Sequence, residues 1–170
     1  MKKRIVYFFI LLLAIIMQTS VLPIISKLQS PGDIVLMLVL VGAVLDGFFG
    51  FFWFAIFAGI FYDLASYTQL GVHALIFLLV IYFVSFFSRR FSVEIKGVGI
   101  LLFAAFVFIA SIVSRVIIAL SMARDLQDLH QFPALFGSLD IVFFQSIFNV
   151  FLFFLCFYVI KKIRIFFDII

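Results

Sequence analysis

Long apolar stretches separated by short polar ones run along most of the chain. Within these stretches polar residues do not recur at every second position, as ILLFAAFVFIASIV at 100–113 illustrates. Strands of a membrane β-barrel alternate between apolar and polar residues. In a bilayer, only helices and closed barrels satisfy the hydrogen bonds of their backbone. The pattern therefore predicts an all-α integral membrane protein.

The apolar stretches predict six transmembrane helices within a single polytopic domain, residues 1–170. We expect spans at about 5–25, 34–45, 50–62, 71–88, 97–120 and 141–160. The second span has only 12 apolar residues, about 18 Å of helix, against a hydrocarbon core of about 30 Å. Turn signals precede and follow it, QSPGD at 29–33 and DGFFG at 46–50. Spans two and three are therefore expected to form a tight helical hairpin.

The distribution of charge predicts the orientation of these helices. Lys and Arg collect in three segments, at the start of the chain, at 89–96 and after residue 160. Cytoplasmic flanks of membrane proteins are enriched in these residues, whereas the segment 121–140 carries more Asp than Arg. An even number of crossings must then precede residue 89, as the hairpin provides. We expect both termini in the cytoplasm, and Asp33 and Asp63 near the outer surface.

Composition excludes a soluble domain. The chain is 68% hydrophobic and 12% charged, whereas globular domains are about half apolar and a quarter charged. The basic residues that give the chain its net charge of +4 lie beside apolar segments. The expected partner is therefore the lipid bilayer and not nucleic acid. A basic start followed by an apolar stretch also describes a signal peptide. VLPIISKL at 21–28 offers no small-x-small cleavage site, so we expect a retained first helix.

The pattern of reactive residues does not indicate catalysis. The single cysteine, Cys156, lies in an apolar run and has no partner for an intramolecular disulfide. We find no Cys/His cluster with the spacing of metal ligands, and no arrangement of a nucleophile with a base. The chain is therefore expected not to be an enzyme and to need no cofactor.

Polar residues at membrane depth are the candidate functional residues. Asp63 follows the third span, and either it fixes a turn that Gly71 closes or it contacts a partner or ligand. Arg115 lies within an apolar run, where a guanidinium either pairs with a carboxylate or reaches the headgroups. Asp63 is the partner we expect if Arg115 pairs. Gln145 and Asn149 share a helix face, which predicts interhelical hydrogen bonds.

Four short motifs resemble the rod shape-determining protein MreD family. They are MQTSVLP at 17–23, PGDIVLMLVL at 31–40, FAGIFYDLAS at 57–66 and QLGVHAL at 69–75. The matching residues include Gln18, Pro31, Asp33, Gly59, Asp63, Leu64, Gly71, His73 and, late in the chain, Asn149. Gly32 is a departure, since members of the family often have the proline and the aspartate adjacent. The second helix is therefore expected to begin one residue later here.

This resemblance implies a non-catalytic scaffold of the cell-wall elongation machinery, needed for rod cell shape, in the bacterial cytoplasmic membrane. Such a scaffold binds the single-span protein MreC. Through MreC it acts on the peptidoglycan polymerase–transpeptidase pair and on the actin-like filament MreB. The resemblance leaves open whether two copies of the chain form a homodimer. The family's fold is similar to the six-helix substrate-binding S-component of energy-coupling-factor (ECF) transporters.

That similarity supplies an alternative, a vitamin-capturing S-component. Such a protein would use the outward face near Asp63, Arg115 and Asp140 as a ligand pocket. Few polar groups converge in the sequence to form one. Small residues, which let membrane helices pack closely, are present instead in and around the expected hairpin: Gly42, Ala43, Gly47, Ala58 and Gly59. These residues favour the scaffold.

Overall fold

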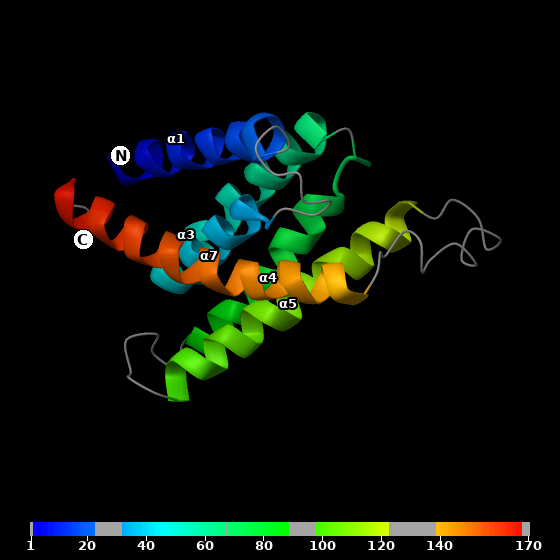
Figure 1. Ribbon diagram of the computed structural model, residues 1–170. Coiled ribbons are helices and arrows are strands. Elements are labelled where there is room, and N and C mark those ends of the chain that lie inside the picture. Colours follow the sequence, from blue (N-terminus) through cyan, green and yellow to red (C-terminus); the bar gives the residue numbers. More distant parts are fainter. Residues whose placement is uncertain (1, 23–31, 67, 89–97, 123–138, 168–170) are drawn as a thin grey trace.

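The computed structural model of the protein describes residues 2–22, 32–66, 68–88, 98–122 and 139–167 (Figure 1). These residues form α1 (Lys2–Ile16), the π-helical turn η1 (Met17–Val21), α3 (Ile34–Ser66), α4 (Val72–Ser88), α5 (Val98–Met122) and α7 (Leu139–Phe166). No strand occurs in the ranges described. The expectation of an all-α protein is therefore confirmed. Pro31 and the basic segment 89–96 lie outside the described residues.

Four helical segments are long and apolar enough to cross a membrane. They are Lys3–Val21, Ile34–Ser66, Gly99–Met122 and Asp140–Phe166. The apolar helix Val72–Ser88 is shorter. Large apolar side chains on these helices remain exposed, among them Leu101 and Phe144, because lipid and not water is the solvent they face. The chain is therefore a multi-pass membrane protein.

The helix α3 is broken at Gly47, which adopts φ 73° and ψ 177°. Residues nine apart in a continuous helix are separated by about 13.5 Å along the axis. Yet a Cβ built on Gly42 would lie 2.2 Å from the ring of Phe51. The two halves of α3, 34–46 and 48–66, therefore fold back on each other (Figure 1). The turn lies within the DGFFG segment that the sequence marked as a turn.

The first half of α3 forms the centre of the molecule. Every residue from Val35 to Ala43 is buried, and a helix that is apolar on all sides is expected to be surrounded by other elements. The helix α4 packs extensively against α3, and α1 and α7 also contact it. The helix α5 packs on α7 and α4. The first half of α3 is thus largely screened from lipid.

Both termini lie at one end of the bundle, which we call the Asp46 end. Asp46 forms ion pairs with Lys3 near the start of α1 and with Arg164 near the end of α7. The distance from Arg164 Nη2 to Asp46 Oδ1 is 3.4 Å. The N and C labels of Figure 1 lie on the same side of the molecule. The opposite end, where α3 begins, is called the Asp33 end.

The helices α3 and α7 extend furthest beyond the spans expected from the sequence. The helix α3 continues to Ser66, so Asp63 lies in its last turn and does not end it. The helix α7 continues to Phe166, because the basic residues after position 160 have long side chains that reach polar surroundings without breaking a helix.

Candidate functional site

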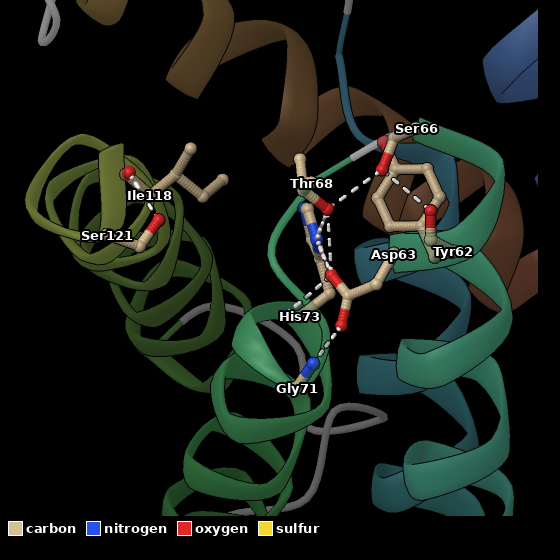
Figure 2. A network of polar contacts seen from close by, with 8 residues as sticks. All are labelled: Tyr62, Asp63, Ser66, Thr68, Gly71, His73, Ile118 and Ser121. Carbon is tan, nitrogen blue, oxygen red and sulfur yellow. Dashed lines mark hydrogen bonds and ion pairs between the residues drawn. The ribbon is translucent and has the colours of Figure 1, made fainter. Parts of the chain in front are cut away.

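Asp63 is the centre of a hydrogen-bond network that closes the turn between α3 and α4 (Figure 2). Its side chain is fully buried. Oδ1 accepts hydrogen bonds from Thr68 Oγ1 at 2.9 Å and from the His73 backbone N–H at 3.2 Å. Oδ1 also lies 2.6 Å from His73 Nδ1, and Oδ2 accepts the Gly71 N–H at 2.7 Å. The Asp63 carboxylate therefore caps the start of α4 and orients the His73 side chain.

The local sequence supports this geometry. Gly71 adopts φ 96°, a left-handed conformation that glycine reaches without steric cost. The Ser66 hydroxyl donates to the carbonyl of Tyr62 at 2.6 Å, and the Thr68 N–H donates to the carbonyl of Asp63 at 3.2 Å. The Tyr62 ring packs edge-on against His73, with centroids 4.4 Å apart. The turn is therefore a compact, hydrogen-bonded unit.

The helices α3 and α4 approach most closely beside this turn. A Cβ built on Gly59 would lie 2.3 Å from the Cα and 2.4 Å from the backbone nitrogen of Ala74. Backbone atoms cannot move aside as the end of a side chain can, so this crossing requires glycine. Gly59 thus allows α3 and α4, which the Asp63 network joins, to approach each other closely. Leu64, in contrast, is 56% exposed and lies at the surface of α3.

A second network holds the start of α3 against η1. The Gln18 amide is buried and donates from Nε2 to the carbonyl of Gly32, while its Oε1 accepts the N–H of Ile34, both at 3.0 Å. Asp33 caps α3, since its Oδ1 accepts the Leu36 N–H at 2.9 Å. The helix begins at Ile34, directly after its capping residue. Burial raises the pKa of the Asp33 carboxyl, and the hydrogen bond from Leu36 opposes this rise.

Asn149 extends the second network to α5 and α7. Its Oδ1 accepts the Asp33 N–H at 2.8 Å, and its Nδ2 donates to Ser111 Oγ at 3.0 Å. A Cβ on Gly32 would lie 2.8 Å from Asn149 Oδ1, so the absence of a side chain at Gly32 makes room for this contact. Three helices and η1 therefore meet around the backbone that enters α3.

The expected ion pair between Asp63 and Arg115 is wrong. Within the described residues, all the partners of Asp63 belong to the turn from Thr68 to His73. Arg115 donates instead to the Gln145 side chain on α7. The carboxylate is already saturated by donors close in sequence, so it does not need the guanidinium.

Arg115 borders a polar cavity of about 220 Å³ at the Asp33 end. The cavity lies between the start of α3, the second half of α5 and the first half of α7. Its lining consists of Asp33, Leu36, Ser111, Ser114, Arg115, Ile118, Met122, Gln145 and Asn149. Asp140 and the Asp63 network do not line it. The sequence therefore singled out Arg115 correctly as an anomaly, but of the residues expected beside it, neither Asp63 nor Asp140 lines its cavity.

A larger apolar groove, of about 1180 Å³, runs between α1 and the second half of α3. Aromatic side chains such as Phe8, Trp53 and Phe57 form its walls, and Arg4 lies in its lining. Trp53 is 66% exposed and Phe57 is 53% exposed. The groove is therefore a continuous apolar surface on the lipid-facing side of two helices.

Sequence reasoning missed Thr68 and Ser114. Thr68 stands five residues after Asp63 in a polar run, and short hydroxyl side chains often bond to nearby turn residues. Ser114 adjoins Arg115 in the sequence, but its position on the cavity side of α5 depends on how the helices pack.

The described part of the chain contains no group of three or more His, Cys, Asp or Glu side chains able to hold a metal ion. In comparisons with known proteins, no family model, no curated protein and no solved structure matches the chain.

Proposed function

We propose that this protein is a non-catalytic membrane scaffold, similar to MreD, of the cell-wall elongation machinery in the bacterial cytoplasmic membrane. One observation supports this proposal above others. Gln18, Asp33, Asp63, His73 and Asn149 carry the resemblance to that family, and all of them form hydrogen bonds that fix helix ends and helix crossings. Their side chains build a rigid shape, as a scaffold requires.

The scaffold is proposed to cross the membrane six times, with both termini in the cytoplasm. The turn at Gly47 and the ion pairs of Asp46 with residues near both termini support this arrangement. Each half of α3 would then be a separate crossing. The first half has 13 residues, about 20 Å of helix, which is short for a bilayer. Its burial by neighbouring helices removes most of the mismatch with lipid.

The groove between α1 and α3 is the proposed docking surface for the transmembrane helix of MreC. It follows α1 from Arg4 to Ile16 and α3 from Phe49 to Ala65, lengths of about 18 and 24 Å. Ala58 and Ala65 lie in it, and small residues let a second backbone approach. MreC would transmit the interaction to MreB and to the peptidoglycan polymerase–transpeptidase pair. Binding of a second copy of this chain in the groove is a competing outcome.

The proposal is tested by depleting the protein in its host and complementing with variants. Trp53→Ala combined with Phe57→Ala removes two exposed walls of the groove. Phe151→Ala combined with Phe83→Ala is the matched control, because these rings are 62% and 53% exposed on other helices. We expect loss of rod shape and of MreC co-purification with the groove variant only. Normal shape in depleted cells would contradict the scaffold function.

A second candidate function is vitamin capture by an ECF S-component, for which the polar cavity at the Asp33 end would be the pocket. Pockets for drug-sized ligands measure about 300–1,000 Å³, whereas this cavity measures about 220 Å³. A vitamin therefore fits it poorly. A vitamin requirement in depleted cells that keep their shape would establish this second function.

A further inference from the structure

The polar cavity at the Asp33 end places opposite charges on its walls without joining them. Asp33 enters from the start of α3 and Arg115 from α5. Asp33 forms no ion pair with any residue that the structure describes, Arg115 included. Opposite charges at membrane depth normally pair. An Asp33 carboxylate without an ion pair, in a cavity that Arg115 also lines, is the arrangement expected of a site whose ligand brings an ammonium to Asp33.

Ser114 supplies a second, independent indication of a ligand. Its side chain is buried, with 5% of the residue exposed, and it lines the cavity. Its hydroxyl forms no hydrogen bond with the described residues. The neighbouring Ser111, in contrast, bonds to Val107 and to Asn149. The Ser114 hydroxyl is not sealed off from the cavity, so a group bound there would be its hydrogen-bond partner.

The position of the cavity along α5 matches the edge of a bilayer. Arg115 lies seven residues before Met122, the last residue of α5, a distance of about 10 Å along the helix. Ser111, Arg115, Ile118 and Met122 line the cavity and share one face of α5. The cavity therefore extends from hydrocarbon depth to the helix end, where lipid headgroups lie.

We propose that this cavity binds a small zwitterion that carries a phosphate or carboxylate and a primary ammonium. The anionic group lies against Arg115 and Ser114, and the ammonium lies against Asp33. A phosphatidylethanolamine headgroup has this chemistry, and so does a soluble zwitterion such as free phosphoethanolamine.

Size and charge select this ligand class. A water molecule occupies about 30 Å³ of liquid, so the 220 Å³ cavity holds the volume of roughly seven waters, enough for a compact headgroup. The Arg115 guanidinium stays positively charged when it donates to Gln145, so its charge favours an anionic group in the cavity that it lines. A ligand with only negative charge would meet the Asp33 carboxylate. A choline headgroup has no N–H with which to bond that carboxylate.

Binding is measured as the shift in thermal unfolding of the purified, delipidated protein in detergent. The probes are short-chain phosphatidylethanolamine, phosphatidylcholine and phosphatidylglycerol, and free phosphoethanolamine. A ligand that binds only the folded state raises its stability by an amount that grows with the logarithm of 1 + [ligand]/Kd. We expect phosphatidylethanolamine to bind at least about tenfold more tightly than the other two lipids. Free phosphoethanolamine binding as tightly as the lipid would identify the ligand as soluble.

Charge-removing variants connect this preference to the cavity. Asp33→Asn keeps a side chain that caps α3 well and removes the negative charge. Asp140→Asn is the matched control, because Asp140 is exposed near the start of α7 and lies outside the cavity. Asp33→Asn is expected to remove the preference for phosphatidylethanolamine over phosphatidylglycerol, and Ser114→Ala to weaken binding of both. Equal binding of all three lipids by the wild type, or an unchanged preference in Asp33→Asn, would overturn the proposal.

Discussion

At the scale of single residues, the polar side chains within this apolar chain act on the backbone. Gln18 bonds to the backbone of Gly32 and Ile34, and Asp63 bonds to that of Gly71 and His73. A buried backbone group without a partner costs about 1–3 kcal/mol, and no water reaches it in a bilayer. These side chains therefore allow the chain to turn between helices where water does not reach the backbone.

Asp63→Asn is expected to lower the free energy of unfolding by about 1–3 kcal/mol. An asparagine whose oxygen replaces Oδ1 must place its NH₂ group where Oδ2 accepts the Gly71 N–H. Two donors then face each other in a buried site. Unfolding in detergent followed by circular dichroism measures the loss, with Asp140→Asn at an exposed position as control. Equal stability of the two variants would show that the second oxygen contributes nothing.

Gln18→Glu is expected to destabilise the protein by about 2 kcal/mol, although the two side chains have nearly the same shape. The amide of Gln18 donates to one backbone group and accepts from another. A carboxylate can accept the N–H of Ile34, but it presents a second acceptor to the carbonyl of Gly32. The same unfolding measurement tests this, and Gln18→Met separates lost hydrogen bonding from repulsion. Wild-type stability of Gln18→Glu would contradict the observed direction of the bond from Nε2.

At the scale of elements, local signals predicted the helices and turns better than the contacts between them. Gly47 turns the chain within DGFFG, and Asp33 caps α3 one residue after Gly32. Both signals are local, because the glycine acts through its own backbone conformation and the aspartate side chain bonds to an N–H three residues later. The partner of Arg115 depends on which helix faces α5. The sequence suggests a carboxylate as the partner but does not show that Gln145 lies opposite.

Gly59→Ala is expected to cost about 3 kcal/mol of stability. Its added methyl group would lie 2.3 Å from the backbone of Ala74, so α3 and α4 must separate near the Asp63 turn. Gly50→Ala is the matched control in the same half of α3, since its methyl group meets only Asp46 Cβ at 3.1 Å. The control should match or exceed wild-type stability, because alanine favours helices over glycine. Equal effects of both variants in thermal unfolding would contradict the close crossing.

At the scale of the whole molecule, the two ends of the bundle differ in chemistry. The Asp46 end joins the termini and the Gly47 turn through ion pairs of the buried Asp46 carboxylate with the partly exposed Lys3 and Arg164 side chains. The Asp33 end holds the hydrogen-bond networks and the polar cavity. This polarity follows from the distribution of charges in the sequence, in which basic residues collect beside the termini. The cavity could not be foreseen, because its walls come from three helices far apart in the chain.

The membrane topology can be tested by labelling single cysteines with a membrane-impermeant maleimide. Cys156→Ala removes the only native cysteine. Reporters replace Phe49, which is 83% exposed beside the Gly47 turn, and Leu70, which is 68% exposed between α3 and α4. With six crossings, Leu70→Cys is labelled from outside intact cells, and Phe49→Cys only after the cytoplasmic face is opened. If α3 instead crossed once, Leu70→Cys would be cytoplasmic and Phe49→Cys would lie near the middle of the bilayer, protected on both sides. Labelling of Leu70→Cys only from the cytoplasmic face would therefore contradict the proposed hairpin crossing, even though the chain bends at Gly47.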